Sequence, residues 1–103
     1  MTVIASKMKL FKGYEQEYKK RHDELWPELK ELLEQSGICE YHIYLDEDNG
    51  TLFALLKTTD VAATECLSTH PVMKKWWHYM KDIMETNADD SPVSIPLKQV
   101  FCL

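Results

Sequence analysis

The feature that most constrains the fold is a pair of apolar segments in the middle of the chain, joined by a short polar turn. Residues 38–46 (ICEYHIYLD) and residues 51–58 (TLFALLKT) each have the length of a β-strand and are rich in apolar and aromatic residues. Between them lies DEDNG, from Asp46 to Gly50, a composition typical of a turn. The two segments therefore predict an antiparallel hairpin.

A strand and a long helical pattern precede this hairpin. Residues 2–9 (TVIASKMK) alternate in polarity and contain β-branched residues, which favours a strand. Helical spacing then covers residues 14–35 and is followed by Gly37, a residue suited to a helix C-terminus. Because Pro27 removes a hydrogen-bond donor within this pattern, we expect a kink or two helical pieces joined near Asp23–Pro27.

Two more helices and a last strand are expected after the hairpin. Asp60 is placed to cap a short helix that ends near Leu67. The His-Pro pair at residues 70–71 then starts a second helix, with the proline at its permitted first position, that continues to about Met84. Residues 97–103 (LKQVFCL) have the pattern of a final strand.

The resulting order is strand, helix, strand, strand, helix, strand. A chain of 103 residues is expected to form one domain, here residues 1–103. An order with a hairpin in its middle fits the α+β class, and specifically a ferredoxin-like split βαβ fold, in which an antiparallel sheet carries its helices on one face.

The segment over residues 38–46 predicts a sheet that is apolar on both faces. Alternation places one set of side chains on one side (Cys39, Tyr41, Ile43, Leu45) and another on the opposite side (Ile38, His42, Tyr44). A sheet with helices on one face normally exposes its other face to water. Since that face is too apolar here, we expect a second copy of the chain to cover it, in a homodimer built as a dimeric α/β barrel.

The charge of the chain argues against a nucleic-acid partner. There are 12 lysines and arginines against 17 acidic residues, for a net charge of −5, and the lysines are interleaved with acids. Binding to nucleic acid requires a basic face, and none is visible in the sequence.

Cysteine usage and hydropathy predict a cytoplasmic protein. Cys39, Cys66 and Cys102 are odd in number, widely spaced and without a Cys-x-x-Cys pair, which favours reduced thiols in the cytosol. No charged-then-apolar leader opens the sequence and no apolar run approaches the length of a membrane span, so no membrane contact is expected.

Two polar aromatic residues lie one turn apart in the first helical segment. At about 100° per residue, Tyr18 and His22 share an arc with Leu25 and Leu29, so both point toward the sheet. A buried imidazole beside a phenol suits proton transfer near neutral pH. The same pattern also fits two amphipathic residues at the rim of the core that bond to the backbone.

The second helix carries the adjacent pair Trp76 and Trp77. The two indoles diverge by about 100° and flank an apolar stripe, so one packs while the other is free to wall a cleft. Core packing alone is the alternative. Tyr41, on the strand side that faces the helices, is placed to add a hydroxyl to the same cleft.

Metal and phosphate sites are not indicated. His42, His70 and His78 do not pair at metal-ligand spacing with one another or with a cysteine. The chain has only three glycines, too few for a phosphate-cradling loop. We expect neither a metal nor a cofactor.

Several segments together resemble L-rhamnose mutarotases, over essentially the whole chain. They are EYKKRHDELWPEL (residues 17–29), YHIYLD (41–46), LFAL (52–55), KWWHYMKDIM (75–84) and DDSPVS (89–94). The resemblance implies a small cytoplasmic homodimer of ferredoxin-like subunits that interconverts the α and β anomers of L-rhamnose. It also implies that His22 is the proton donor and that the sugar is bound by Tyr18, Tyr41, Trp76 and Trp77.

The chemistry expected from this resemblance is general acid–base ring opening and closure. His22 would act as the acid, while a tyrosine hydroxyl or a water completes the proton circuit. Two other functions suit the same scaffold, a non-catalytic small-molecule-binding dimer and a small cofactor-free oxygenase, because a fold does not fix a function. No role is expected for His78.

Overall fold

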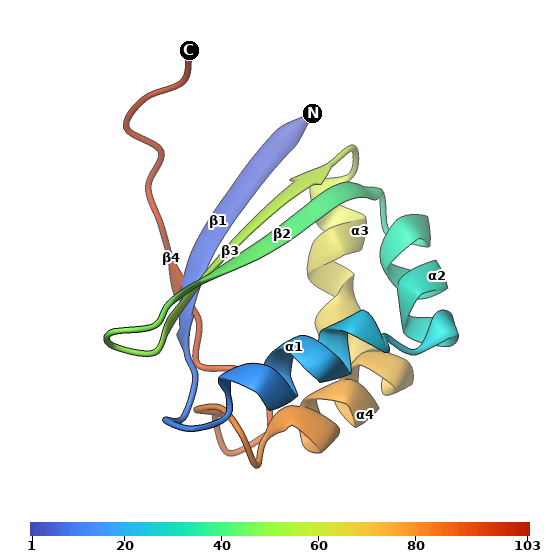
Figure 1. Cartoon of the computed structure of the whole chain (residues 1–103). Coiled ribbons are helices and arrows are strands. Elements are labelled where there is room, and N and C mark those ends of the chain that lie inside the picture. Colours follow the sequence, from blue (N-terminus) through green and yellow to red (C-terminus); the bar gives the residue numbers. More distant parts are fainter.

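The computed structural model describes residues 1–103, and the central hairpin has the bounds that the sequence predicts. Strands β2 (Ile38–Asp46) and β3 (Thr51–Thr58) pair antiparallel (Figure 1). Gly50 closes the turn with φ +73°, and a Cβ there would lie 2.8 Å from the carbonyl oxygen of Leu10. Only glycine tolerates both the positive φ and the close carbonyl oxygen, so the conformation of this turn requires glycine at position 50.

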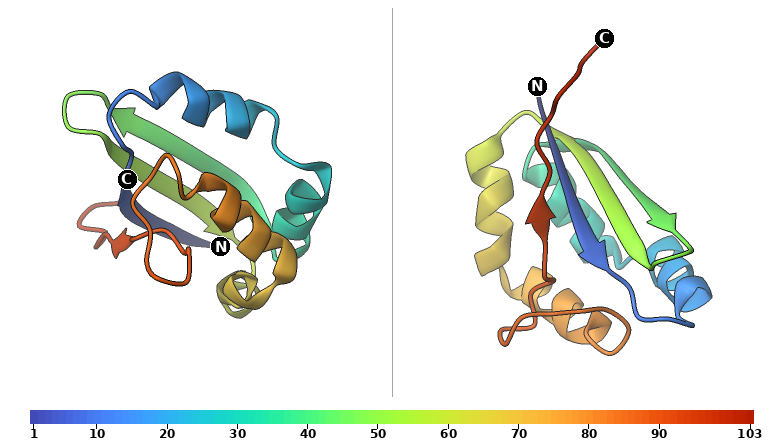
Figure 2. Two further views of the ribbon diagram at one scale, coloured as in Figure 1. Left: turned by 90° about the horizontal axis from the view of Figure 1, so that it is seen from below. Right: turned by 90° about the vertical axis from the view of Figure 1, so that its left-hand side faces the viewer.

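The other elements follow the predicted order. They are β1 (Thr2–Lys9), α1 (Glu15–Asp23), α2 (Pro27–Gln35), α3 (Val61–Glu65), a 3-10 turn (Cys66–Thr69), α4 (Pro71–Met80) and β4 (Ile95–Pro96). The four strands form one antiparallel sheet in the order β2-β3-β1-β4, and all helices cover the same face of it (Figures 1 and 2). This arrangement confirms the ferredoxin-like α+β fold. No helix is both long and apolar enough to cross a membrane.

Three helix starts are determined by local chemistry. Pro27 occupies the first position of α2 and separates it from α1, as the sequence predicts. Asp60 caps α3 by accepting a hydrogen bond from the Ala63 amide at 3.0 Å. His70 caps α4 in the same way, since its Nδ1 accepts from the Val72 amide at 3.2 Å.

The core lies between the helices and the sheet. From the sheet, Leu52 and Ala54 of β3 are buried, and Ile43 and Leu45 of β2 stand opposite them in the register. Ile38 at the start of β2 is also buried, and the remaining buried apolar side chains come from the helices and their connections (Leu10, Tyr18, Leu29, Trp76, Met80, Ile83, Met84). The cluster holds α2 and α4 against the sheet.

The predicted position of Ile38 on the outer face is wrong. Ile38 is buried and pairs with Thr58, whereas Glu40 pairs with Lys57, so the register shifts between residues 38 and 40. This β-bulge inserts one residue, Cys39, and turns the side chain before it to the helix-covered face.

Two predictions near the C-terminus are also wrong. Helix α4 ends at Met80 rather than near Met84, because Met84 forms a bridge with Leu10 in line with β1. The last strand is Ile95–Pro96 rather than residues 97–103. Beyond the bond from the Leu97 amide to Ala5, that segment pairs with no strand, and Figure 1 shows it leaving the body of the molecule.

The uncovered face of the sheet is rich in exposed apolar groups. Tyr44 of β2 is 62% exposed, and it lies opposite Phe53 of β3, which is 39% exposed. Leu55 of β3, Val3 of β1 and Ile95 of β4 extend this surface across the sheet. We call these five residues the outer apolar face.

Candidate active site

A cavity of about 700 Å³ lies between helix α1 and the helix-covered face of the sheet. Ten of its 16 lining residues are hydrophobic. That volume is in the range of small-molecule sites, which are mostly apolar with a few polar groups. The lining comprises Glu15, Gln16, Tyr18, Lys19, His22, Asp23, Leu25, Leu29, Leu33, Tyr41, Ile43, Leu45, Glu47, Leu52, Met73 and Trp76.

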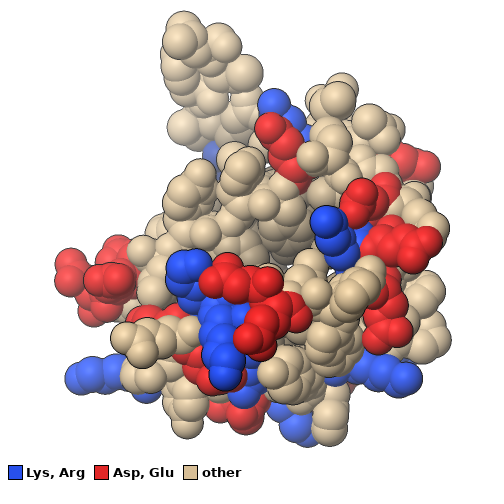
Figure 3. Space-filling model, turned by 45° about the vertical axis from the view of Figure 1, so that its right-hand side comes forward, with Lys and Arg blue, Asp and Glu red and all other residues tan.

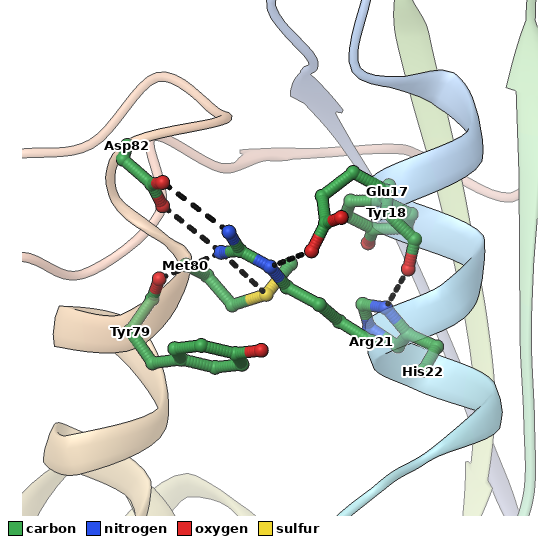
Figure 4. Close-up of polar contacts among 7 residues, drawn as sticks. All are labelled: Glu17, Tyr18, Arg21, His22, Tyr79, Met80 and Asp82. Carbon is green, nitrogen blue, oxygen red and sulfur yellow. Dashed lines mark hydrogen bonds and ion pairs between the residues drawn. The ribbon is translucent and has the colours of Figure 1, made fainter.

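His22 has one ring nitrogen fixed and the other free. Its Nδ1 lies 2.9 Å from the carbonyl oxygen of Tyr18, one turn earlier on α1 (Figure 4). Because a carbonyl can only accept, Nδ1 carries the hydrogen, and Nε2 of the neutral ring holds the lone pair. The burial of the imidazole lowers its pKa below 6.5. His22 is therefore a neutral base at pH 7.

Aromatic rings hold the imidazole on two sides. The Tyr18 ring stacks on it at 4.2 Å between centroids, and the Trp76 ring meets it at 90° and 5.4 Å. Trp26, the residue before α2, packs edge-on against Trp76 at 5.1 Å from the other direction. The position of His22 is thus determined by packing as well as by its hydrogen bond.

The two phenols of the cavity remain protonated at neutral pH. Burial raises the pKa of Tyr18, and the nearby Tyr41 raises it further. Desolvation also raises the pKa of Tyr41. Both hydroxyls therefore keep their hydrogen and are able to donate a hydrogen bond.

Four of the five residues singled out in the sequence meet in this cavity. Tyr18, His22, Tyr41 and Trp76 all line it. Trp77 does not, because its indole packs partly buried against the core. Of the two tryptophans, the more deeply buried one walls the cavity: Trp76 is 5% exposed.

Sequence reasoning missed two residues that support the site. Trp26 stands in the WPEL run, and nothing in the sequence indicates that its aromatic ring backs Trp76. Arg21 bonds both to Glu17 within α1 and to the Tyr79 carbonyl in the last turn of α4 (Figure 4). The only local signal for Arg21 is the spacing to Glu17, four residues earlier on the helix.

No metal site and no basic surface is found outside this cavity. No group of three or more His, Cys, Asp or Glu residues is placed to hold a metal ion. The His78 ring pairs with Asp90 at 2.9 Å on an exposed part of α4. On the face drawn in Figure 3, lysine and arginine side chains are interspersed with acidic ones and form no continuous basic surface.

The sheet, its single helical layer and the cavity between them define a ferredoxin-like α+β protein with a candidate site for a small molecule. The family model described as L-rhamnose mutarotase matches residues 3–103. The chain belongs to the L-rhamnose mutarotase family.

Individual relatives are similar along nearly their whole length. An L-rhamnose mutarotase from Formosa agariphila is 52% identical over 101 residues, which covers 98% of this chain and 97% of the relative. One from Brucella anthropi is 56% identical over 97 residues, covering 94% and 92%.

Solved structures agree with the fold. The crystal structure of an L-rhamnose mutarotase from Formosa agariphila superimposes with a TM-score of 0.93 at 50% identity, covering 100% of this chain and 99% of that one. A protein from Shewanella oneidensis has a TM-score of 0.58 at 16% identity, covering 82% and 81%, and shares the fold alone.

Proposed function

We propose that this chain is an isomerase that interconverts the α and β anomers of L-rhamnose, with His22 as the catalytic residue. The observation that carries the proposal is a neutral imidazole, edge-on to Trp76, in an apolar cavity of a chain that belongs to the L-rhamnose mutarotase family.

The reaction requires one proton to move between two oxygens on the same carbon. Ring opening removes the hydrogen from the anomeric hydroxyl O1, forms the C1 carbonyl, breaks the C1–O5 bond and protonates O5. Rotation about the C1–C2 bond presents the other face of the aldehyde, and the reverse steps close the ring. General acid–base assistance to such steps contributes about 10²–10⁴ in rate.

His22 is suited to carry that proton through Nε2. In its neutral form Nε2 accepts the O1 hydrogen, and the imidazolium then donates it to O5, which makes His22 the proton donor of the opening step. The Tyr18 carbonyl holds Nδ1–H throughout, so the ring does not change its orientation. A lowered pKa makes the imidazolium a stronger acid, which favours the donation.

The rest of the cavity suits a 6-deoxy sugar. The methyl and C–H faces of rhamnose are apolar and fit against Trp76 and the aliphatic lining. The hydroxyls of Tyr18 and Tyr41 supply donors that orient the polar edge of the sugar. Binding by Trp77 stays a prediction, with no lining contact in the single chain to support it.

We also propose that the protein acts as a homodimer in the cytoplasm. The outer apolar face, Tyr44, Phe53, Leu55, Val3 and Ile95, supports association with a second copy. All three cysteines are free, which supports a reducing compartment.

The test is the rate of anomer exchange of L-rhamnose, measured by magnetisation transfer between the α and β anomeric protons. The wild-type chain should accelerate exchange, and His22→Ala should lose about 10²–10⁴ of that acceleration. His78→Ala is the matched control, because that histidine is also on a helix but is 68% exposed on the surface, and it should exchange at the wild-type rate.

The other two functions give different results in the same samples. A binding-only dimer would bind the sugar without accelerating exchange. An oxygenase would consume dioxygen with a larger aromatic substrate and leave rhamnose exchange at its spontaneous rate. Either outcome would overturn the mutarotase proposal.

A further inference from the structure

The side chain of Arg21 makes more polar contacts than any other on helix α1. Its Nε donates to Glu17 at 2.7 Å, and its two terminal nitrogens donate to the Asp82 carboxylate at 2.9 and 3.2 Å (Figure 4). Nη1 also donates to the carbonyl oxygen of Tyr79 at 2.7 Å, and the guanidinium lies 4.3 Å from the centre of the Tyr79 ring. The side chain of Arg21 is only 10% exposed.

These bonds join helix α1 to the end of helix α4. The Tyr79 carbonyl belongs to the last turn of α4, where carbonyls lack partners within the helix and the helix dipole is negative. Asp82 follows directly after that turn. A cation at this place both satisfies a free carbonyl and binds the neighbouring carboxylate in a fork, a geometry available to arginine but not to lysine.

Apolar packing does little to hold α1 in place. Tyr18 is the only one of its nine residues that is buried. Helix α4, in contrast, buries Trp76 and Met80. The orientation of α1 therefore depends strongly on the Arg21 contacts.

The contacts of Arg21 lead directly to the contact between His22 and Trp76 in the candidate site. His22 is the next residue on α1, and its ring meets Trp76 of α4 at 5.4 Å. The Tyr79 ring under the guanidinium lies 5.7 Å from the Trp76 ring. Arg21 thus bridges the two helices whose relative position sets the His22–Trp76 contact, yet it does not line the cavity itself.

We infer that Arg21, through Asp82 and Tyr79, is a positioning residue that holds His22 in register with Trp76 for proton transfer to the bound sugar. The inference rests on the proposed mutarotase function. A displacement of about 1 Å at a reacting group costs on the order of 10²-fold in rate. Weakening the bridge should therefore lower kcat while the apolar cavity continues to bind the sugar.

Two carboxylate variants separate positioning from general charge effects. Asp82→Asn weakens the bond between helices, whereas Glu17→Gln weakens a bond within α1 that cannot fix α1 against α4. Both remove one negative charge and preserve the shape of the side chain. We expect Asp82→Asn to lower kcat about 10-fold or more with KM within about twofold, and Glu17→Gln to change both by less than about twofold.

Folding is not expected to obscure this comparison, because the Asp82 side chain is 63% exposed. Arg21→Lys keeps the charge but loses the fork, and it should resemble Asp82→Asn. In the double variant that combines Arg21→Lys with Asp82→Asn, the two losses of kcat should not add, since both substitutions weaken the same bridge. A matching loss of the nuclear Overhauser contact between the His22 and Trp76 rings would show the displacement directly.

The results also distinguish the inference from the proposed function. If the wild type accelerates exchange but Asp82→Asn keeps its kcat, or loses kcat no more than Glu17→Gln does, the positioning role is wrong and the function stands. If the wild type does not accelerate exchange, the function falls. The ring contact then decides the inference: its loss in Asp82→Asn alone supports a positioning role, and its persistence overturns it.

Discussion

The candidate active site depends at the residue scale on a backbone carbonyl. The Tyr18 oxygen selects the tautomer of His22 with hydrogen on Nδ1, and that choice leaves the lone pair on Nε2. An α-helix brings residue 18 and residue 22 together wherever the helix forms. The tautomer is therefore built into α1 and needs no second side chain.

The lowered pKa of His22 gives a signed prediction for pH. Its cause is burial, and the charged or ionisable groups that share the cavity with it are Tyr18 and Tyr41 together with Glu15, Lys19, Asp23 and Glu47. If neutral His22 starts the reaction, kcat should rise with pH through a midpoint below 6.5 and then stay level, since both phenols titrate above 10. Anomer exchange measured from pH 4.5 to 9, with the spontaneous rate subtracted, tests this.

The same shift has a consequence for stability. The folded state holds the neutral imidazole, so the unfolded chain binds the extra proton first as pH falls. The contribution of His22 to the free energy of unfolding is complete above pH 6.5 and decreases as pH falls below it toward the folded pKa.

A kcat midpoint above 6.5, or a rate that falls with rising pH, would contradict the neutral-base assignment.

Local spacing was enough to place some site residues and not others. Tyr18 and His22 lie on one helical arc, and the structure brings both to the cavity. Spacing alone did not show whether Trp76 or Trp77 walls the cavity, because that depends on where α1 and Trp26 pack against α4. The Arg21–Asp82 pair spans 61 positions and has no local signature.

At the element scale, the connection from α2 to β2 depends on one crowded glycine. Gly37 has φ +94°, and a Cβ there would lie 3.0–3.1 Å from the Thr58 and Thr59 hydroxyl oxygens and the Asp60 amide nitrogen. Gly13 has the same φ but no atom within 4 Å of its Cβ position. A comparison of the two glycines therefore separates the cost of the positive φ, which both share, from the cost of crowding, which only Gly37 has.

Alanine at these two positions should therefore destabilise to different degrees. Gly13→Ala should lower the free energy of unfolding by about 1–2 kcal/mol from the left-handed backbone alone. Gly37→Ala should cost more, because the hydroxyls and the backbone must also move. Urea denaturation midpoints measure both. Equal losses would show that the contacts around Gly37 relax without cost.

The sequence predicts elements well where their signals are local. The bounds of β1, β2 and β3 and the break at Pro27 all follow from local patterns. Helix α4 ends early because residues after Met80 bond to the chain beyond β1, as in the bond from the Phe11 amide to the Ile83 carbonyl. Ile83 is fully buried in that turn. The apolar residues after Met80 therefore reflect burial in a turn and not a continuation of the helix.

The whole molecule has apolar surface that a single chain does not cover. The alternating pattern of residues 97–103 led to the prediction of a strand, yet Val100 and Phe101 are 88% and 76% exposed. The outer apolar face likewise exposes apolar side chains, in this case on the sheet itself. Apolar strand-like sequence without a partner in its own chain favours association between copies.

A charge placed on the outer apolar face should therefore separate the copies. Phe53→Asp introduces a carboxylate at the centre of the sheet, opposite Tyr44, where association would bury it unpaired at a high cost. Tyr14→Asp is the control, because Tyr14 is 41% exposed, close to the 39% of Phe53, but precedes α1 on the helical side, where aspartate is a favourable cap. Sedimentation velocity should find a dimer for the wild type and for Tyr14→Asp, and a monomer for Phe53→Asp. A wild-type monomer, or a Phe53→Asp dimer, would show that this face is not the interface.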